Sequence, residues 1–140
     1  MSIKLNRKKR ELKKRTNVIQ ERNDLSLIYI AARCAEEKKG DNISLLDVSK
    51  LTTVSDYFLI VTAKSTVQIE AISKHIEEKL GKMNHKLVCK EGFLASNWVV
   101  LDFGNLIVHI MSQKEREYYK LERFWSNATL IDNKLWEKAS

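Results

Sequence analysis

The sequence predicts a single-domain α/β sandwich built on a mixed sheet of about five strands. With 140 residues and 44% hydrophobic content, the chain can fill one core but hardly two. Segments with helical periodicity and short apolar runs follow one another in the order helix, strand, strand, helix, two or three strands, helix. Two of the apolar runs are joined by Gly104-Asn105, a two-residue turn signature that predicts a β-hairpin.

Charge divides the chain into a basic arm and a neutral body. Residues 1–22 hold nine basic and two acidic residues, a net charge of +7 that equals the formal charge of the whole chain. Because this stretch offers few apolar groups, we expect 1–22 to be a disordered or transiently helical arm, 23–126 to be the domain and 127–140 a C-terminal extension. The positive charge favours contact with RNA phosphates, and a solvated tail is the alternative. The arm residues expected to contact RNA are Arg7, Lys8, Lys9, Arg10, Lys13, Lys14 and Arg15.

Composition also bears on compartment and bound groups. No apolar run approaches the roughly 18 residues that a membrane-spanning helix needs, and no apolar stretch follows the N-terminal charges. We therefore expect a cytoplasmic protein with no membrane partner. A bacterial cytoplasm is the preferred compartment, and an organelle is left open as the alternative. Cys34 and Cys89 lack a CxxC spacing or flanking histidines, so we interpret both as buried thiols rather than a disulfide or a zinc site. The sequence indicates neither a metal ion nor a cofactor.

The first half of the chain predicts two helices and two strands. A helix is expected over 25–38, and Ile43 to Val48 is a strand candidate. Tyr57 to Thr62 is β-branched and aromatic without alternation, which is typical of a central strand covered on both faces.

A capping box opens the second helix. The Ser65 side chain is expected to accept from the Gln68 amide, and the Gln68 side chain to return to Ser65. Apolar residues then recur at helical spacing, at Ile69, Ile72, Ile76 and Leu80. His75 has no second ligand at a metal spacing, so we interpret it as a solvated surface histidine.

The second half begins with a strand candidate at His85 to Lys90, followed by the hairpin of Trp98 to Phe103 and Leu106 to Met111. The Gly104-Asn105 turn predicts a register in which the numbers of paired residues sum to 209. One face of the hairpin is then wholly apolar, with Val99, Leu101, Phe103, Leu106, Val108 and Ile110. The opposite face is mixed, with Trp98, Val100, Asp102, Ile107, His109 and Met111, and such a mixture indicates a role in binding.

A last helix is predicted after the hairpin. The segment from Ser112 to Glu115 is a second capping box, and the helix that it opens is expected to continue towards Trp125. Trp, Tyr and Arg are the favoured anchors of protein interfaces, so Trp98, Tyr119 and Arg123 are candidates for binding. Ordinary core packing is the alternative for the two aromatic residues.

Catalytic motifs are absent from the sequence. It contains no GxxxxGK[ST], GxGxxG, GxSxG or HExxH pattern, and four glycines hardly suffice for a phosphate-binding loop. Asp102 and His109 lie diagonally on the mixed face and can form a polar pair. A catalytic dyad would need a neighbouring Ser or Cys that the sequence does not supply, so a structural or interface pair is preferred and we expect no enzyme.

Seven segments form an ordered pattern over about eighty residues. They are Asp47-Val48-Ser49, Leu51-Thr52 with Ser55 to Phe58, Ser65 with Gln68, Ala71 and Ile72, Glu91-Gly92, Trp98 to Gly104, Ile107 to His109, and Arg116 to Tyr119 with Leu121, Glu122 and Trp125. In order and spacing they resemble the ribosomal silencing factor (RsfS or Iojap-like) family.

The resemblance implies a nucleotidyltransferase-like fold without catalytic residues. It also implies binding to the large ribosomal subunit, through a ribosomal protein of the uL14 family on the intersubunit face, that blocks joining of the small subunit and represses translation. The expected ribosomal-protein-binding residues are Trp98, Asp102, His109, Tyr119, Leu121, Glu122, Arg123 and Trp125. A nucleotidyltransferase-like or nucleotide-binding enzyme using Asp56, Asp102 and His109 is the alternative, and a homodimer through the mixed face is left open. The resemblance does not account for the basic arm.

Overall fold

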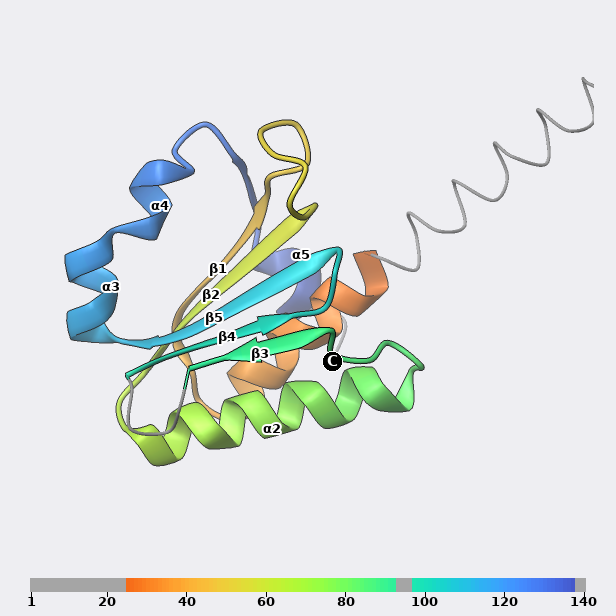
Figure 1. Ribbon diagram of the computed structural model, residues 1–140, viewed down its shortest axis with the longest axis vertical. Helices are drawn as coiled ribbons and strands as arrows, with labels where there is room; N and C mark the ends of the chain where they lie inside the picture. The colour runs from red at the N-terminus through yellow and green to blue at the C-terminus, as the bar shows by residue number, and fades with distance from the viewer. Residues whose placement is uncertain (1–24, 93–96, 138–140) are drawn as a thin grey trace, which may run out of the picture.

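A six-stranded mixed sheet with helices on both faces forms the part of the protein that the structure describes (Figure 1). The structure is a computed structural model that describes residues 25–92 and 97–137. The strands are Asp41–Asp47 (β1), Tyr57–Ala63 (β2), Cys89–Glu91 (β3), Trp98–Asp102 (β4), Leu106–Ser112 (β5) and Thr129–Ile131 (β6). The helices are the first helix over 25–37, Thr66–Lys82 (α2), Gln113–Tyr119 (α3), Leu121–Phe124 (α4) and Lys134–Glu137 (α5). The predicted α/β fold class is confirmed, with one strand more than expected.

The sheet runs in the order β3-β4-β5-β2-β1-β6. Strands β2 and β5 pair in parallel at its centre, whereas every other neighbouring pair among the described strands is antiparallel. Residues 58–63 of β2 are all buried, which confirms that the unalternating apolar run is a central strand covered on both faces.

The hairpin has the predicted register. Trp98 pairs with Met111 and Asp102 with Ile107, so the paired numbers sum to 209. The whole apolar face of the hairpin is buried in the main core. The two-residue turn sets this register, and the apolar pattern supports it, because a slip of one residue would move all six side chains to the opposite face of the sheet.

The first helix, α2 and α5 cover one face of the sheet, and α3 and α4 cover the other (Figure 1). The main core lies under the first three helices. Ser65 caps α2 as predicted, since its hydroxyl accepts from the Gln68 amide at 3.1 Å. The Gln68 side chain, however, accepts from the Lys64 amide and donates to the carbonyls of Lys38 and Lys39, so the predicted return to Ser65 is wrong. It links the start of α2 to the end of the first helix instead.

The predicted continuous last helix is also wrong. Ser112 caps α3 through the Glu115 amide, as expected, but Lys120 adopts a left-handed conformation with φ 47° and ψ 51° and separates α3 from α4. The two short helices lie over a second, smaller core on the mixed face. This core contains Leu46, Val48, Phe58, Ile60, Ile107 and Met111.

Other local predictions need correction. The strand expected over 85–90 is the short β3, on which Cys89 is exposed, whereas Cys34 is buried as predicted. His75 is not simply solvated, because its Nε2 lies 2.6 Å from a Glu37 carboxylate oxygen on the first helix.

The segment expected as a C-terminal extension contributes to the fold. Within 127–140, strand β6 pairs antiparallel with β1. The Trp136 side chain of α5 is only 3% exposed and belongs to the main core. The short apolar run of β6 therefore completes an edge of the sheet.

Candidate protein-docking face

Six aromatic rings form a continuous row over the mixed face of the sheet, and we call them the aromatic row. Each ring contacts the next, and both ends of the row lie on residues 113–125, which comprise α3, α4 and the residue after α4 and which we call the α3–α4 segment. The centroid distances are 5.0 Å for Tyr118–Tyr119, 4.7 Å for Tyr119–Trp98, 5.8 Å for Trp98–His109, 5.6 Å for His109–Phe58 and 4.9 Å for Phe58–Trp125. Such tilted and edge-on contacts stabilise aromatic pairs beyond the burial of their area. The row therefore joins the sheet to the segment that covers it.

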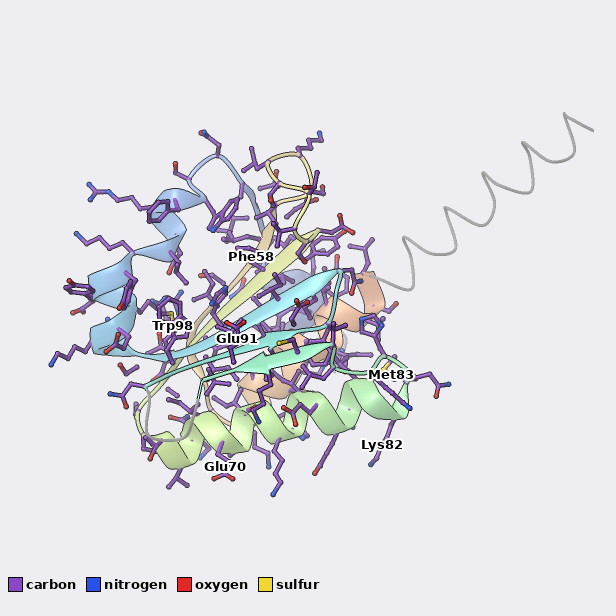
Figure 2. The ribbon with its side chains drawn as sticks, in the orientation of Figure 1. Phe58, Glu70, Lys82, Met83, Glu91 and Trp98 are labelled. Carbon is purple, nitrogen blue, oxygen red and sulfur yellow. The ribbon has the colours of Figure 1, made fainter. Side chains whose placement is uncertain are left out.

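Trp98 is half-buried at the start of β4, on the side of the sheet that faces α3 and α4 (Figure 2). One part of its ring packs against Tyr119, which remains 44% exposed. Its indole N–H donates to Nδ1 of His109 at 3.1 Å. The ring is thus held between Tyr119 and His109, and it also lines a groove at the surface.

His109 is a neutral hydrogen-bond acceptor in this arrangement. Burial lowers the pKa of its imidazole to about 4, so the ring is uncharged at neutral pH. Because Nδ1 accepts from Trp98, the ring proton must reside on Nε2. Asp102 is not the partner of His109, since its carboxylate accepts from the Gly104 amide at 2.8 Å and supports the hairpin turn. The polar pair expected between Asp102 and His109 is therefore corrected.

Arg116 anchors α3 to the sheet. Its side chain is almost fully buried and donates to the hydroxyl of Thr62 at 2.9 Å, the hydroxyl of Ser44 at 3.1 Å and the carbonyl of Asn42. It also forms an ion pair with Glu122 at 2.7 Å. Sequence reasoning missed this role, because an arginine in a helix rich in charge gives no sign of burial.

The remaining predicted binding residues divide into two groups. Leu121 and Trp125 turn inward and pack against the second core, and Glu122 is occupied by Arg116. Arg123 is exposed on α4. Tyr118 and Phe124, which were not among the predicted site residues, are 77% and 81% exposed, although the clustering of aromatic residues in this segment was a signal for them.

A groove of about 580 Å³ opens beside Trp98 and Tyr119 of the aromatic row. Its walls come from β3, β4 and α3, and two carboxylates, those of Glu91 and Glu115, lie along it. The groove and the exposed aromatic edges together form a surface that is apolar in part and polar at its rim, as in protein interfaces.

Among the described residues, no hydrogen bond or ion pair connects the side chains of Asp56, Asp102 and His109, the three residues of the enzyme alternative. Asp56 lies in the loop before β2, where its backbone N–H donates to the Asn105 carbonyl, and Asp102 and His109 have the separate partners described above. Among residues 25–92 and 97–137, no three His, Cys, Asp or Glu side chains are grouped so that they could hold a metal ion. The same ranges contain no helix long and apolar enough to cross a membrane. The basic arm residues lie outside the described part of the chain.

Comparisons with known proteins agree with this fold. The family model "Ribosomal silencing factor during starvation" matches residues 20–140. The ribosomal silencing factor RsfS of Bacillus subtilis is 36% identical over 110 residues, which cover 79% of this chain and 93% of that protein. The mouse "Mitochondrial assembly of ribosomal large subunit protein 1" is 30% identical over 103 residues, which cover 69% of this chain and 43% of that protein.

A solved structure is similar as well. The crystal structure of a Chromobacterium violaceum protein superimposes with a TM-score of 0.71 at 31% identity, covering 73% of this chain and 85% of that one. The family match spans the whole described domain, β6 and α5 included. The chain therefore belongs to the ribosomal silencing factor family.

Proposed function

We propose that the protein binds the large ribosomal subunit, through a ribosomal protein of the uL14 family, and blocks joining of the small subunit so that translation is repressed. The observation that carries the proposal is the aromatic row, in which the half-buried Trp98 is held by Tyr119 and His109 and Tyr119 remains 44% exposed. The mouse relative, named for assembly of the ribosomal large subunit, supports this choice of subunit.

The proposed mechanism is steric. A folded body with a radius of gyration of about 13 Å, placed on the intersubunit face, occupies space that the small subunit needs. Occupancy requires affinity and a fixed orientation but no chemical step. We assign affinity to the aromatic edges of Trp98 and Tyr119, and orientation to Arg123 and the carboxylates of the neighbouring groove.

The basic arm adds a second contact in this proposal. Residues 1–22 carry the net positive charge of the chain, which favours contact with the phosphates of ribosomal RNA. We therefore expect the arm to contact nearby phosphates after the folded domain has bound.

Sedimentation with separated subunits tests the function. The full chain should travel with the large subunit and not with the small one. Adding it before the small subunit should reduce the fraction of joined ribosomes in proportion to its occupancy. Sedimentation with the small subunit alone, or normal joining at full occupancy of the large one, would contradict the proposal.

A further inference from the structure

Ring contacts through one residue, His109, connect the two ends of the α3–α4 segment. Trp98 supports Tyr119 at the end of α3, and Phe58 supports Trp125 just after α4. His109, on β5, contacts both supports, with its ring 5.8 Å from Trp98 and 5.6 Å from Phe58. No other residue of the aromatic row accepts a hydrogen bond from a neighbouring ring among the interactions of the described residues.

We propose that His109 is a positioning residue of the docking face, which touches no partner itself and holds Trp98 in the orientation that binds. This inference rests on the proposed function, because the orientation of Trp98 matters only if Trp98 docks. It assigns to His109 an indirect role in place of the direct contact that the sequence led us to expect.

The chemistry of the imidazole supports this role. A tryptophan N–H is only a donor, and at this site its acceptor is the lone pair of Nδ1. Burial lowers the pKa of the imidazole to about 4, so the ring is neutral at neutral pH and the Nδ1 lone pair is available there. A charged imidazole would present two donors and could not accept.

Loss of the acceptor should change the surface rather than the core. Without Nδ1, the indole N–H of Trp98 loses the acceptor that it has at 3.1 Å, and we expect the half-buried ring to turn from its present position towards a new acceptor or water. A turned ring leaves Tyr119, which is held against it at 4.7 Å. The docking surface would then be disordered while the sheet beneath it remained packed.

Two substitutions separate the acceptor from the ring. His109→Phe keeps an aromatic ring beside Phe58 but removes the acceptor, whereas His109→Asn removes the ring and keeps an oxygen near the place of Nδ1. We expect His109→Phe to weaken binding of the full chain to the large subunit by roughly tenfold or more, with a smaller fall in melting temperature than His109→Asn because the ring beside Phe58 is kept. We expect His109→Asn to bind within about threefold of the parent, despite a lower melting temperature.

Nuclear magnetic resonance supplies a readout that a purely structural role would not move. The indole N–H resonance of Trp98, assigned with Trp98→Phe, should shift in His109→Phe and stay close to its parental position in His109→Asn. In the parent, the proton should reside on Nε2 of His109. Parental binding by His109→Phe, binding by His109→Asn as weak as that of His109→Phe, or a proton on Nδ1 would each overturn the positioning role.

The outcome also distinguishes this inference from the proposed function. If the parent binds neither subunit, docking itself is refuted and the positioning role falls with it. If the parent binds the large subunit and His109→Phe binds equally well, the proposed function stands and the inference alone is refuted.

Discussion

The guanidinium of Arg116 on α3 pairs with the carboxylate of Glu122 on α4 across the left-handed break at Lys120. The same guanidinium donates to hydroxyls of β1 and β2. Helices of seven and four residues are too short to be stable alone. One buried side chain thus joins both of them to each other and to the sheet.

Replacing Arg116 should therefore destabilise the fold. Arg116→Met should lower the free energy of unfolding by about 3 kcal/mol, near the lower limit for a broken buried pair, because Glu122 is half-exposed and can be solvated. Urea unfolding measures this quantity. Arg123→Met, on the exposed side of the same segment, is the matched control and should change it by less than about 0.5 kcal/mol. Equal effects of the two substitutions would show that Arg116 does not hold the segment.

The left-handed conformation at Lys120 predicts that glycine is more stable than alanine at this position. A residue with a side chain pays for its φ of 47°, whereas glycine does not. Lys120→Gly should be more stable than Lys120→Ala by about 1 kcal/mol, although glycine is the poorer helix former. Comparing these two variants by urea unfolding cancels the loss of the lysine charge. If alanine proves the more stable, the segment is a continuous helix after all.

Truncation of the exposed aromatic edge should affect binding. Tyr119→Ala should weaken binding to the large subunit by about 2 kcal/mol, or roughly thirtyfold, at little cost to folding since the ring is 44% exposed. Trp98→Ala should weaken binding at least as much and should also lower the melting temperature, because Trp98 packs on the second core. Val67→Ala, at an exposed position on α2 in the opposite layer, should bind normally. Undiminished binding by Tyr119→Ala would place the docking face elsewhere.

Removal of residues 1–22 should alter the salt dependence of binding. The deleted arm carries nine basic residues, and each phosphate contact that it loses should reduce the slope of log affinity against log salt by about 0.7 to 0.9. Thermal unfolding should change little, because the arm has few apolar groups to pack. An unchanged slope would mean that the arm contacts no phosphate.

Stability should depend on pH through His109. Above the ordinary pKa of 6.5, the imidazole is neutral in both folded and unfolded chains and contributes nothing to the dependence. Between 6.5 and the folded value of about 4, only the unfolded chain takes up the proton, so stability falls as the pH falls, by up to about 1.4 kcal/mol per pH unit. His109→Phe should remove this component of the slope. Parallel stability curves for parent and variant would show that the ring is not shielded from water.

Local chemistry made part of this fold predictable. The Gly104-Asn105 turn fixed the hairpin register, and the two serine caps marked where α2 and α3 begin. The left-handed Lys120 was not predictable, because such breaks are expected at glycine or asparagine. Strand β6 was missed because its three residues are too few to show a period.

The contacts within the candidate site were only partly predictable. The mixed face and the aromatic clustering pointed to Trp98 and Tyr119, which do lie together. The predicted Asp102–His109 pair was wrong because the spacing of residues on strands does not determine which donor a carboxylate will accept from. The Asp102 carboxylate accepts a hydrogen bond from the Gly104 amide instead. The burial of Arg116 depends on strands some fifty and seventy residues earlier, which no local pattern encodes.

The parallel pairing of β2 with β5 at the centre of the sheet has a consequence for folding order. Tyr57 pairs with Leu106, so these strands meet only after the chain that forms α2, β3 and β4 has been made and brought back. Such non-local pairing is slow compared with helix and hairpin formation. The α3–α4 segment follows β5 and is anchored on side chains of β1, β2 and β4, so it has nothing to rest on until that step is complete. A chain still emerging during synthesis, or trapped before this closure, would leave β2 and β5 without their parallel partner and would lack the proposed docking surface, so only the finished fold would present it.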